Sequence, residues 1–212
     1  MQEYEELGHM IQINEDASSA EKQYYLPHHA VFKSSSSTTH TRIVFDGSCH
    51  SSNGLSWNYT LLVGSTIQQD LYSIVLQFRT YQIAFTTDIA KMYHQVRIHQ
   101  DDRKLQRILW RRSADEPLRT DELSTVMYGT ASATYLATRC LQQLAEDESK
   151  DFSLAPATLT NNFYVDDALC GAKTIEDALQ LQQELIALLG RGGFHIRKFC
   201  ASHPSVLSSN PS

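Results

Sequence analysis

Cysteine is scarce in this chain, and long hydrophobic runs are missing from it. The four cysteines, Cys49, Cys140, Cys170 and Cys200, are widely spaced and form no Cys-x-x-Cys pair, which argues against a zinc knuckle or a disulfide framework. No apolar run approaches the roughly 20 residues that a membrane-spanning helix needs, and the acidic, polar start is unlike a signal peptide. We therefore expect a globular, intracellular protein with no membrane partner.

A net positive charge is missing as well. The 212 residues include 18 lysines and arginines against 24 aspartates and glutamates, which gives a formal net charge of -6. This acidic balance argues against binding nucleic acid through bulk charge alone. Basic residues gather locally at 97–112 and 191–198, but charge alone favours a solvated surface as their explanation. A hydrophobic content of 42% is enough for a packed core.

Two adjacent aspartates are the most informative feature that is present. Asp166 and Asp167 interrupt the otherwise uncharged run 161–169 and follow the β-prone residues 163–165. This pattern predicts a hairpin with both charges at its tip. Like charges at such close range repel each other, so a bound cation is a natural reason to keep them together.

A third acid of the same kind lies upstream. Asp88 stands in the strand-like run 83–89, with no basic residue before Lys91. Asp88, Asp166 and Asp167 are therefore candidate ligands for a pair of Mg2+ ions, or Mn2+, in the kind of site that polymerases and nucleases use for phosphoryl transfer. Taken alone, each element is better explained as an ordinary turn or strand end, because aspartate is common in turns.

The remaining pattern predicts an α+β fold. The expected elements are a polar helix and linker to about residue 20, a hairpin of strands 24–32 and 41–45, helices at 65–78, 133–144 and 175–189, and strands at 105–110, 123–128 and 194–199. Their order suits an antiparallel sheet with helices on one face. Such a sheet brings Asp88 next to Asp166.

Five sequence blocks occur together in an order that is similar to one known family. They are Tyr24–Val31, Arg42–Ser48, Thr87–Val96, the Tyr-Val-Asp-Asp box at Tyr164–Asp167, and Gly192–Phe199. Each block is weak alone, but the five follow one another over nearly the whole chain. The chain therefore resembles the reverse transcriptase domain of a Pao/BEL-type LTR retrotransposon polyprotein.

This resemblance implies a right-hand polymerase fold with an antiparallel palm sheet and with the thumb missing. The divisions that it implies are an N-terminal helix or linker at 1–20, fingers-like segments at 21–63 and 96–132, palm segments at 64–95 and 133–203, and a tail at 204–212. The implied activity is that of an RNA-directed DNA polymerase. Its implied partners are an RNA or DNA template with its primer, deoxynucleoside triphosphates, and the protease, RNase H and integrase of a parent polyprotein, within a cytoplasmic virus-like particle.

Roles for individual residues follow from the same resemblance. Asp88, Asp166 and Asp167 are implied to be the catalytic metal ligands. Lys33 and Arg42 are implied to hold the triphosphate of the incoming nucleotide, as basic side chains do for phosphates. Without the resemblance, Lys33 and Arg42 are solvated charges on either side of a hairpin tip.

Four further residues are implied to lie around the nucleotide. Tyr93 resembles an aromatic steric gate that excludes a 2′-hydroxyl, and its alternative role is that of a core aromatic. Tyr128 and Gly129 resemble the segment beneath the nucleotide and template, and alternatively they are a strand end and a turn. Lys198 resembles a basic residue that protonates the departing pyrophosphate, and alternatively it is a solvated lysine.

The chain also departs from the family pattern at a few positions. Thr134 replaces a usual proline, Ala90 replaces a usual acidic residue, and Ser202–His203 replaces Ser-Asn. None of these changes removes a metal ligand. Two alternatives to a polymerase stay open: an inactive relic or domesticated domain that binds nucleic acid or a protein, and an unrelated metal-dependent nuclease.

Overall fold

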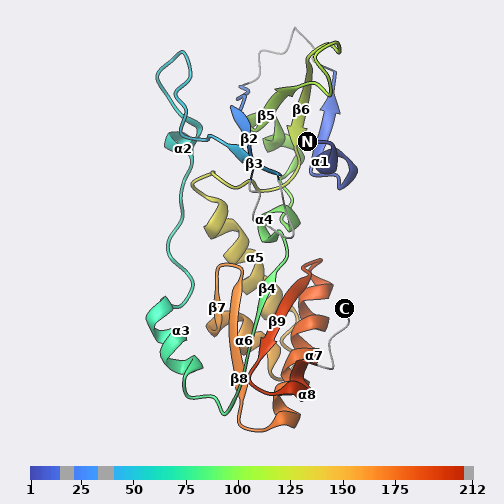
Figure 1. Ribbon diagram of the computed structural model, residues 1–212. Coiled ribbons are helices and arrows are strands. Elements are labelled where there is room, and N and C mark those ends of the chain that lie inside the picture. The colour runs from blue at the N-terminus through green and yellow to red at the C-terminus, as the bar shows by residue number, and fades with distance from the viewer. Residues whose placement is uncertain (15–21, 33–40, 208–212) are drawn as a thin grey trace. The chain divides into compact units, whose positions relative to one another are not determined.

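The computed structural model describes residues 1–14, 22–32 and 41–207 (Figure 1). The chain divides into two compact units, and each of them is built from two stretches of chain. Unit 1 comprises Met1–Gly64 and Val96–Ala133, and unit 2 comprises Ser65–Gln95 and Thr134–Ser212. Lys33 and the expected hairpin tip lie outside the described residues.

Unit 1 contains a three-stranded antiparallel sheet and a separate two-stranded hairpin. Its helices and strands are α1 (Gln2–Glu6), β1 (Met10–Ile13), β2 (His28–Phe32), β3 (Thr41–Phe45), α2 (Trp57–Thr60), a 3-10 helix (Gln100–Leu105), β5 (Arg107–Trp110) and β6 (Arg119–Leu123). The sheet has the order β1-β6-β5, and β2 pairs with β3. A core of buried apolar side chains joins the sheet to the hairpin, and it consists of Met10, Leu26, Phe45, Ile108, Leu123 and Met127.

Unit 2 is built around a four-stranded antiparallel sheet of order β7-β8-β4-β9. Its elements are α3 (Leu71–Phe78), β4 (Ile83–Ile89), α4 (Met92–Gln95), α5 (Ala133–Asp147), α6 (Ala155–Asn161), β7 (Phe163–Tyr164), β8 (Asp167–Ala172), α7 (Ile175–Arg191), β9 (Ile196–Ala201) and α8 (Pro204–Leu207). None of the helices in the described part of the chain is long and apolar enough to cross a bilayer.

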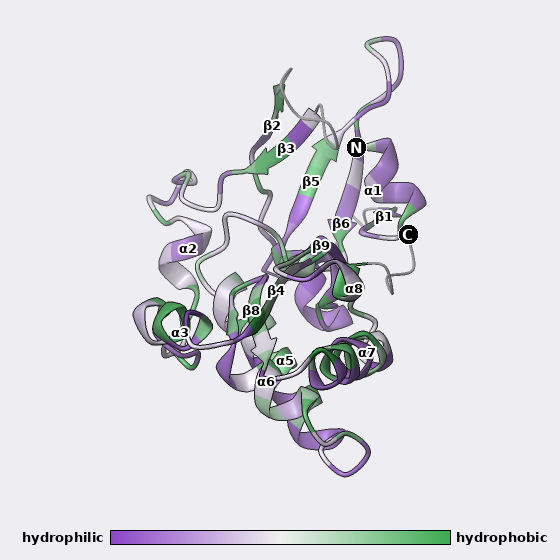
Figure 2. Cartoon of the chain, turned by 60° about the horizontal axis from the view of Figure 1, so that its bottom comes forward, coloured by the Kyte–Doolittle hydropathy of each residue, from purple (hydrophilic) through white to green (hydrophobic). Residues whose placement is uncertain are grey.

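The two faces of the unit 2 sheet differ in burial. Phe85, Thr87 and Ile89 alternate along β4 and are buried, as are Ala168 and Cys170 on β8. Side chains two apart on a strand share a face, and the amphipathic helix α7 contacts both strands. Figure 2 shows β4 and β8 largely in the hydrophobic colour and α7 in both colours. The intervening positions of β4 and β8 therefore face away from this core.

The structure confirms the predicted hairpin of strands ending at Phe32 and Phe45, the helix from Ala133, and the antiparallel sheet that carries the acids. Three predicted elements were wrong in extent. The helix expected from residue 65 begins at Leu71, the strand expected at 123–128 is Arg119–Leu123, and the strand expected at 194–199 is Ile196–Ala201. In the segment expected to be a helix and a linker, the helix Gln2–Glu6 is followed by the strand Met10–Ile13.

The late start of α3 has a local cause. The Asp70 carboxylate accepts a hydrogen bond from the backbone N–H of Ser73 at 3.0 Å, which is the arrangement of an N-cap residue. The segment before it is not helical, and in it the side chain of Gln68 accepts the N–H of Val165 at 3.1 Å. Hydrophobic spacing alone did not reveal either interaction.

Candidate functional site

The three aspartates meet where β4 runs beside β8. Asp88 and Asp167 are directly opposite each other in the antiparallel register, and the backbone N–H of Ile89 donates to the carbonyl oxygen of Asp166 at 2.8 Å. Opposed residues in such a pair have Cα atoms about 4.5–5.5 Å apart. The sheet therefore brings Asp88 beside the Asp166–Asp167 hairpin, as expected from the sequence. All three acids lie in unit 2.

The hairpin turn itself has an unusual backbone. Val165 has a φ of 56°, a value that is a clear outlier for a β-branched residue. Its N–H is held by the Gln68 side chain at 3.1 Å. Backbone strain of this kind costs about 1–3 kcal/mol and persists only where the surroundings fix it. The strained residue immediately precedes Asp166 and so sets the direction in which the two acids leave the turn.

Two consecutive basic residues contact the carboxylate of Asp88. The Nε atom of Arg197 lies 3.0 Å from Oδ1, and the Nζ atom of Lys198 lies 2.6 Å from Oδ2. The side chain of Asp88 is only 13% exposed, whereas those of Arg197 and Lys198 are 44% and 58% exposed. Both carboxylate oxygens of Asp88 therefore have a cationic partner.

A bulge in β9 explains how neighbours in sequence reach the same acid. In a regular strand, consecutive side chains point to opposite faces. Here Thr86 pairs with Cys200 and Asp88 with Arg197, so β9 carries one more residue than β4 between the two pairs. Lys198 takes up the extra length with a φ of 54°, which is how a bulge redirects a side chain. The sequence led us to expect one basic residue beside the hairpin, and Arg197 was missed.

Mutual repulsion among the acids contributes to a raised pKa of Asp167. Burial raises its pKa, and the charges of Asp166 and Asp88 raise it further, while Lys198 opposes them. The three carboxylates are thus close enough to interact, and carboxylate oxygens are the ligands that Mg2+ and Mn2+ prefer. As the side chains stand, no group of three or more His, Cys, Asp or Glu within the described residues is arranged to hold an ion. The donor type fits a hard divalent cation, and Asp88 must share or release its basic partners to bind one.

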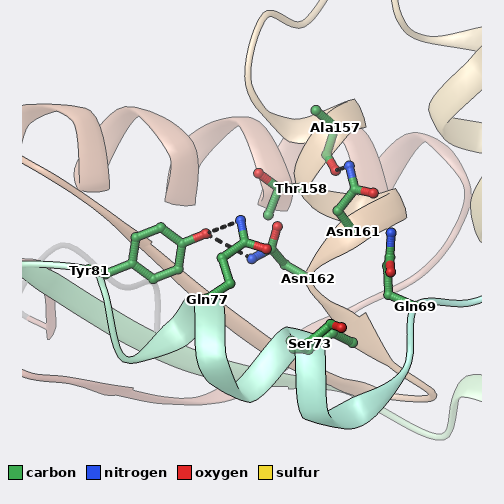
Figure 3. A pocket seen from close by; sticks show the side chains of 9 residues that line it. Gln69, Ser73, Gln77, Tyr81, Ala157, Thr158, Asn161 and Asn162 are labelled. Atoms are coloured by element: carbon green, nitrogen blue, oxygen red, sulfur yellow. Dashed lines mark hydrogen bonds between the residues drawn. The ribbon is translucent and has the colours of Figure 1, made fainter.

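Hydrogen bonds from amide side chains hold the strands of the acidic hairpin in place. A cleft of about 440 Å³ lies between α3 and α6. Figure 3 shows that Gln77 and Asn162 point towards Tyr81 in it. The Tyr81 hydroxyl accepts hydrogen bonds from both amides, each at 2.9 Å. Buried Asn162 also donates to the carbonyl oxygen of Leu169 at 3.1 Å. These contacts attach β8 to the segment that leads into β4, and nothing in the local sequence pattern indicated them.

Tyr93 lies on the short helix α4, five positions after Asp88. Its hydroxyl is 3.1 Å from the hydroxyl of Thr134 at the start of α5. The residue is partly buried, so it is neither a fully packed core aromatic nor a free surface tyrosine. Thr134 is one of the positions at which the chain departs from the resembled family, and it provides this contact.

The remaining described candidates lie together in unit 1. The guanidinium carbon of Arg42 on β3 is 5.0 Å from the ring centroid of Tyr128, within the range of a cation–π interaction. Gly129 follows with a φ of 92°, and a Cβ built there would lie 2.4 Å from the carbonyl oxygen of Phe45. The structure thus brings Tyr128 and Gly129 against β3, with Tyr128 beside Arg42 and Gly129 beside Phe45.

An acidic site on an antiparallel sheet and a basic, aromatic segment at a hairpin fit the nucleic-acid polymerase class that the sequence led us to expect. Residues 36–199 match the family described as reverse transcriptase (RNA-dependent DNA polymerase), and the chain therefore belongs to that family. A search of curated proteins gives no match.

One solved structure has a fold similar to that of this chain. The foamy viral protease-reverse transcriptase in complex with an RNA/DNA hybrid is similar with a TM-score of 0.66 and 15% sequence identity, over 92% of this chain and 22% of that chain. At this identity the likeness shows the fold alone. It confirms the predicted mixed fold with antiparallel sheets, similar to that of a reverse transcriptase. The chain spans about a fifth of the length of that relative.

Proposed function

We propose that this chain is the fingers and palm part of the reverse transcriptase of a Pao/BEL-type LTR retrotransposon. In this proposal unit 1 is the fingers and unit 2 is the palm, and the intact enzyme extends a primer on an RNA or DNA template with deoxynucleoside triphosphates. The observation that carries the proposal is the cross-strand pairing of Asp88 with Asp167 beside Asp166. The five sequence blocks favour the Pao/BEL group.

The reaction is the transfer of a nucleotidyl group. The primer 3′-hydroxyl oxygen forms a bond to the α-phosphorus, the bond from that phosphorus to the bridging oxygen breaks, and pyrophosphate leaves. Asp88, Asp166 and Asp167 would hold two divalent cations, Mg2+ or Mn2+, which when bound activate the attacking hydroxyl and neutralise charge on the leaving group.

The side chains of the protein have separate tasks in this proposal. Arg42 and Lys33 bind the triphosphate, Tyr93 excludes a 2′-hydroxyl, and the Tyr128–Gly129 segment supports the nucleotide and template. Lys198 donates a proton to the departing pyrophosphate. Because its Nζ atom lies 2.6 Å from Asp88, Lys198 must leave that carboxylate before it can donate.

Further partners follow from the proposed parent element. The foamy viral relative is a protease-reverse transcriptase that was determined with an RNA/DNA hybrid. We extend both properties to this chain by analogy: a template-primer duplex as its ligand, and a polyprotein with a protease as its natural setting. The RNase H and integrase of that polyprotein are proposed from the resemblance to Pao/BEL elements. The proposed site of action is intracellular.

One observation favours a second candidate, a catalytically inactive relic that keeps the fold and binds nucleic acid or a protein. Arg197 and Lys198 occupy both carboxylate oxygens of Asp88, and a permanent ionic cluster of this kind would block cation binding. The two candidates differ in whether divalent cations displace these contacts.

Primer extension on poly(rA)/oligo(dT) tests the proposal. We expect the wild type to extend the primer with Mg2+ or Mn2+, Asp166→Asn to lose that activity, and the exposed turn variant Asp115→Asn to keep it. No extension by the wild type, with the duplex still bound, would favour the relic. Degradation of the template that depends on Asp166 would favour a nuclease.

A further inference from the structure

We propose that Asn58 is a positioning residue that fixes the Tyr128–Gly129 segment against the end of β3, and thereby sets the affinity for the incoming nucleotide. The sequence pattern did not single out Asn58. The inference rests on the proposed function, because it concerns how the nucleotide-binding segment of that function is held. Every residue involved lies in unit 1.

The carboxamide of Asn58 bridges two separate segments of the chain. Its Nδ2 atom donates to the carbonyl oxygen of Gly129 and to the hydroxyl of Ser48, each at 2.9 Å. Its Oδ1 atom accepts the backbone N–H of Ala131 at 2.8 Å. Both donors and the acceptor of the side chain are thus used. Two of the three bonds hold the first and last residues of the 129–131 segment, so the carboxamide forms a clip across it.

The backbone of Asn58 is anchored as firmly as its side chain. Its N–H donates to the carbonyl oxygen of Gly47 at 2.8 Å, just beyond β3. Ser56 caps the short helix α2, since its hydroxyl oxygen accepts the N–H of Tyr59 at 3.2 Å. The neighbouring Trp57 stacks on Tyr24, with ring centroids 5.7 Å apart. The carboxamide is therefore presented from a fixed support.

Two glycines show how closely the segments approach. A Cβ at Gly47 would lie 2.8 Å from Asn58 Oδ1 and 2.9 Å from the carbonyl oxygen of Gly129. A Cβ at Gly129 would lie 2.4 Å from the carbonyl oxygen of Phe45. Distances below 3.0 Å leave no room for a side chain, so glycine is required where backbone packs on backbone. Asn58 fills the remaining space and supplies the hydrogen bonds.

The clip links two groups that the proposed function assigns to the nucleotide. β3 carries Arg42, whose guanidinium carbon lies 5.0 Å from the centroid of the Tyr128 ring. Asn58 binds Gly129 and Ala131, which follow Tyr128 in the chain. The Asn58 carboxamide therefore helps to hold the segment beneath the nucleotide next to the strand that carries the phosphate-binding arginine. Loss of binding that the ground state and the transition state share raises KM and leaves kcat unchanged.

Two substitutions separate the parts of the clip. Asn58→Ala removes all three hydrogen bonds. Asn58→Asp keeps the acceptor for the Ala131 N–H but places an oxygen opposite the Gly129 carbonyl oxygen. Asn53→Asp is the matched control, because Asn53 uses its Oδ1 atom in an exposed turn, accepting from Ser51 and the N–H of Leu55, and the Asp variant keeps that acceptor.

Three quantities are measured on the full chain with template-primer. They are the Kd for dTTP by titration, the kinetics of primer extension, and the exchange rate of the Ala131 amide proton. We expect Asn58→Ala and Asn58→Asp to raise the Kd and KM for dTTP about tenfold to a hundredfold with little change in kcat. The Ala131 amide should exchange faster in Asn58→Ala and stay protected in Asn58→Asp. Asn53→Asp should match the wild type in every measurement.

The outcomes distinguish this inference from the proposed function. If the wild type extends primers but the Asn58 variants keep the wild-type Kd and KM, the positioning role is wrong and the polymerase stands. A fall in kcat and melting temperature with unchanged KM would show a merely structural residue and would also overturn it. If the wild type neither binds dTTP nor extends a primer, both proposals fail. Equal exchange of the Ala131 amide in wild type and Asn58→Ala would contradict the clip whatever the activity.

Discussion

The acidic site of unit 2 and the Tyr128–Gly129 segment of unit 1 are assembled in different ways. Strand register brings Asp88 beside Asp167, and the contact is a property of the backbone ladder. The Tyr128–Gly129 segment depends instead on one side chain, Asn58, and on backbone packing that only glycine allows. Register is fixed by the alternation of buried and exposed residues along the strands. A side-chain clip leaves no such periodic pattern.

This difference predicts how the two regions respond to substitution. In unit 2, an acid can be neutralised without moving the strands, because the ladder does not involve its side chain. In unit 1, changing a clip residue or a tightly packed glycine moves the backbone itself. Activity and stability should therefore separate in unit 2 and change together in unit 1.

The largest expected effect is that of Asp167→Asn. Losing one carboxylate of the proposed cation site should reduce primer extension about a thousandfold or more, which corresponds to roughly 4 kcal/mol of barrier at about 1.4 kcal/mol per tenfold. The fold should become more stable, because burial and the charges of Asp166 and Asp88 raise the pKa of Asp167, so its ionised form is unfavourable in the folded state at neutral pH. Extension assays and thermal unfolding at about pH 7 measure the two effects.

Asp115→Asn serves as the control, since Asp115 lies in the exposed turn between β5 and β6. It should change neither activity nor melting temperature. A melting temperature that falls in Asp167→Asn would contradict the view that the acids repel one another without a cation. In that case the Asp167 carboxylate would stabilise the fold. Activity and stability would then change together in unit 2, as they do in unit 1.

A smaller effect is expected from Gly129→Ala. Its positive φ alone costs an alanine about 1–3 kcal/mol, and a Cβ only 2.4 Å from the Phe45 carbonyl oxygen forces the backbone to shift as well. Stability and dTTP affinity should therefore fall together. Gly54→Ala is the matched comparison, because Gly54 has a φ of 79° with nothing within 4 Å of the added Cβ, so it should cost only about 1–2 kcal/mol. Equal unfolding free energies for the two variants would remove the packing argument.

The same contrast explains what sequence could predict. The strand of Asp88, the acidic hairpin and the helix after Thr174 are encoded locally, by apolar alternation, turn residues and a cap. The cap is Thr174, whose hydroxyl oxygen accepts the N–H of Asp177 at 3.1 Å. Antiparallel pairing of these strands then followed from their order. The acids of the candidate site are therefore predictable from short stretches of sequence alone.

Contacts between distant side chains could not be predicted in this way. The bulge at Lys198 depends on how β9 pairs with β4, so the second basic partner, Arg197, was missed. The helix α6 was missed because its N-terminus starts at Leu154, which offers no side-chain cap. Strand β1 was missed because its partner β6 is distant in the sequence. Each of these missed features depends on a contact with a residue that is distant in the sequence.

The smallest expected effect comes from a clip outside the site, in unit 2. The carboxylate of Glu184 on α7 accepts the backbone N–H groups of Leu154 and Ala155 at 2.7 and 3.1 Å and so caps α6 from a distance. Burial alone would raise the pKa of Glu184, but these bonds, with those from Gln180 and Ser153, outweigh it and lower the pKa to about 2.

Glu184→Gln should therefore cost about 0.5–2 kcal/mol at neutral pH, as the loss of a helix cap does. A carboxyl group with a lowered pKa contributes stability that is complete above its unfolded value of 4.5 and is lost as the pH falls towards 2. The difference in unfolding free energy between wild type and variant should thus shrink between about pH 5 and pH 2, measured by urea unfolding, while the exposed turn variant Glu116→Gln shows no such trend. A difference that stayed constant across this range would mean that Glu184 acts by packing alone and that its carboxylate charge does not cap α6.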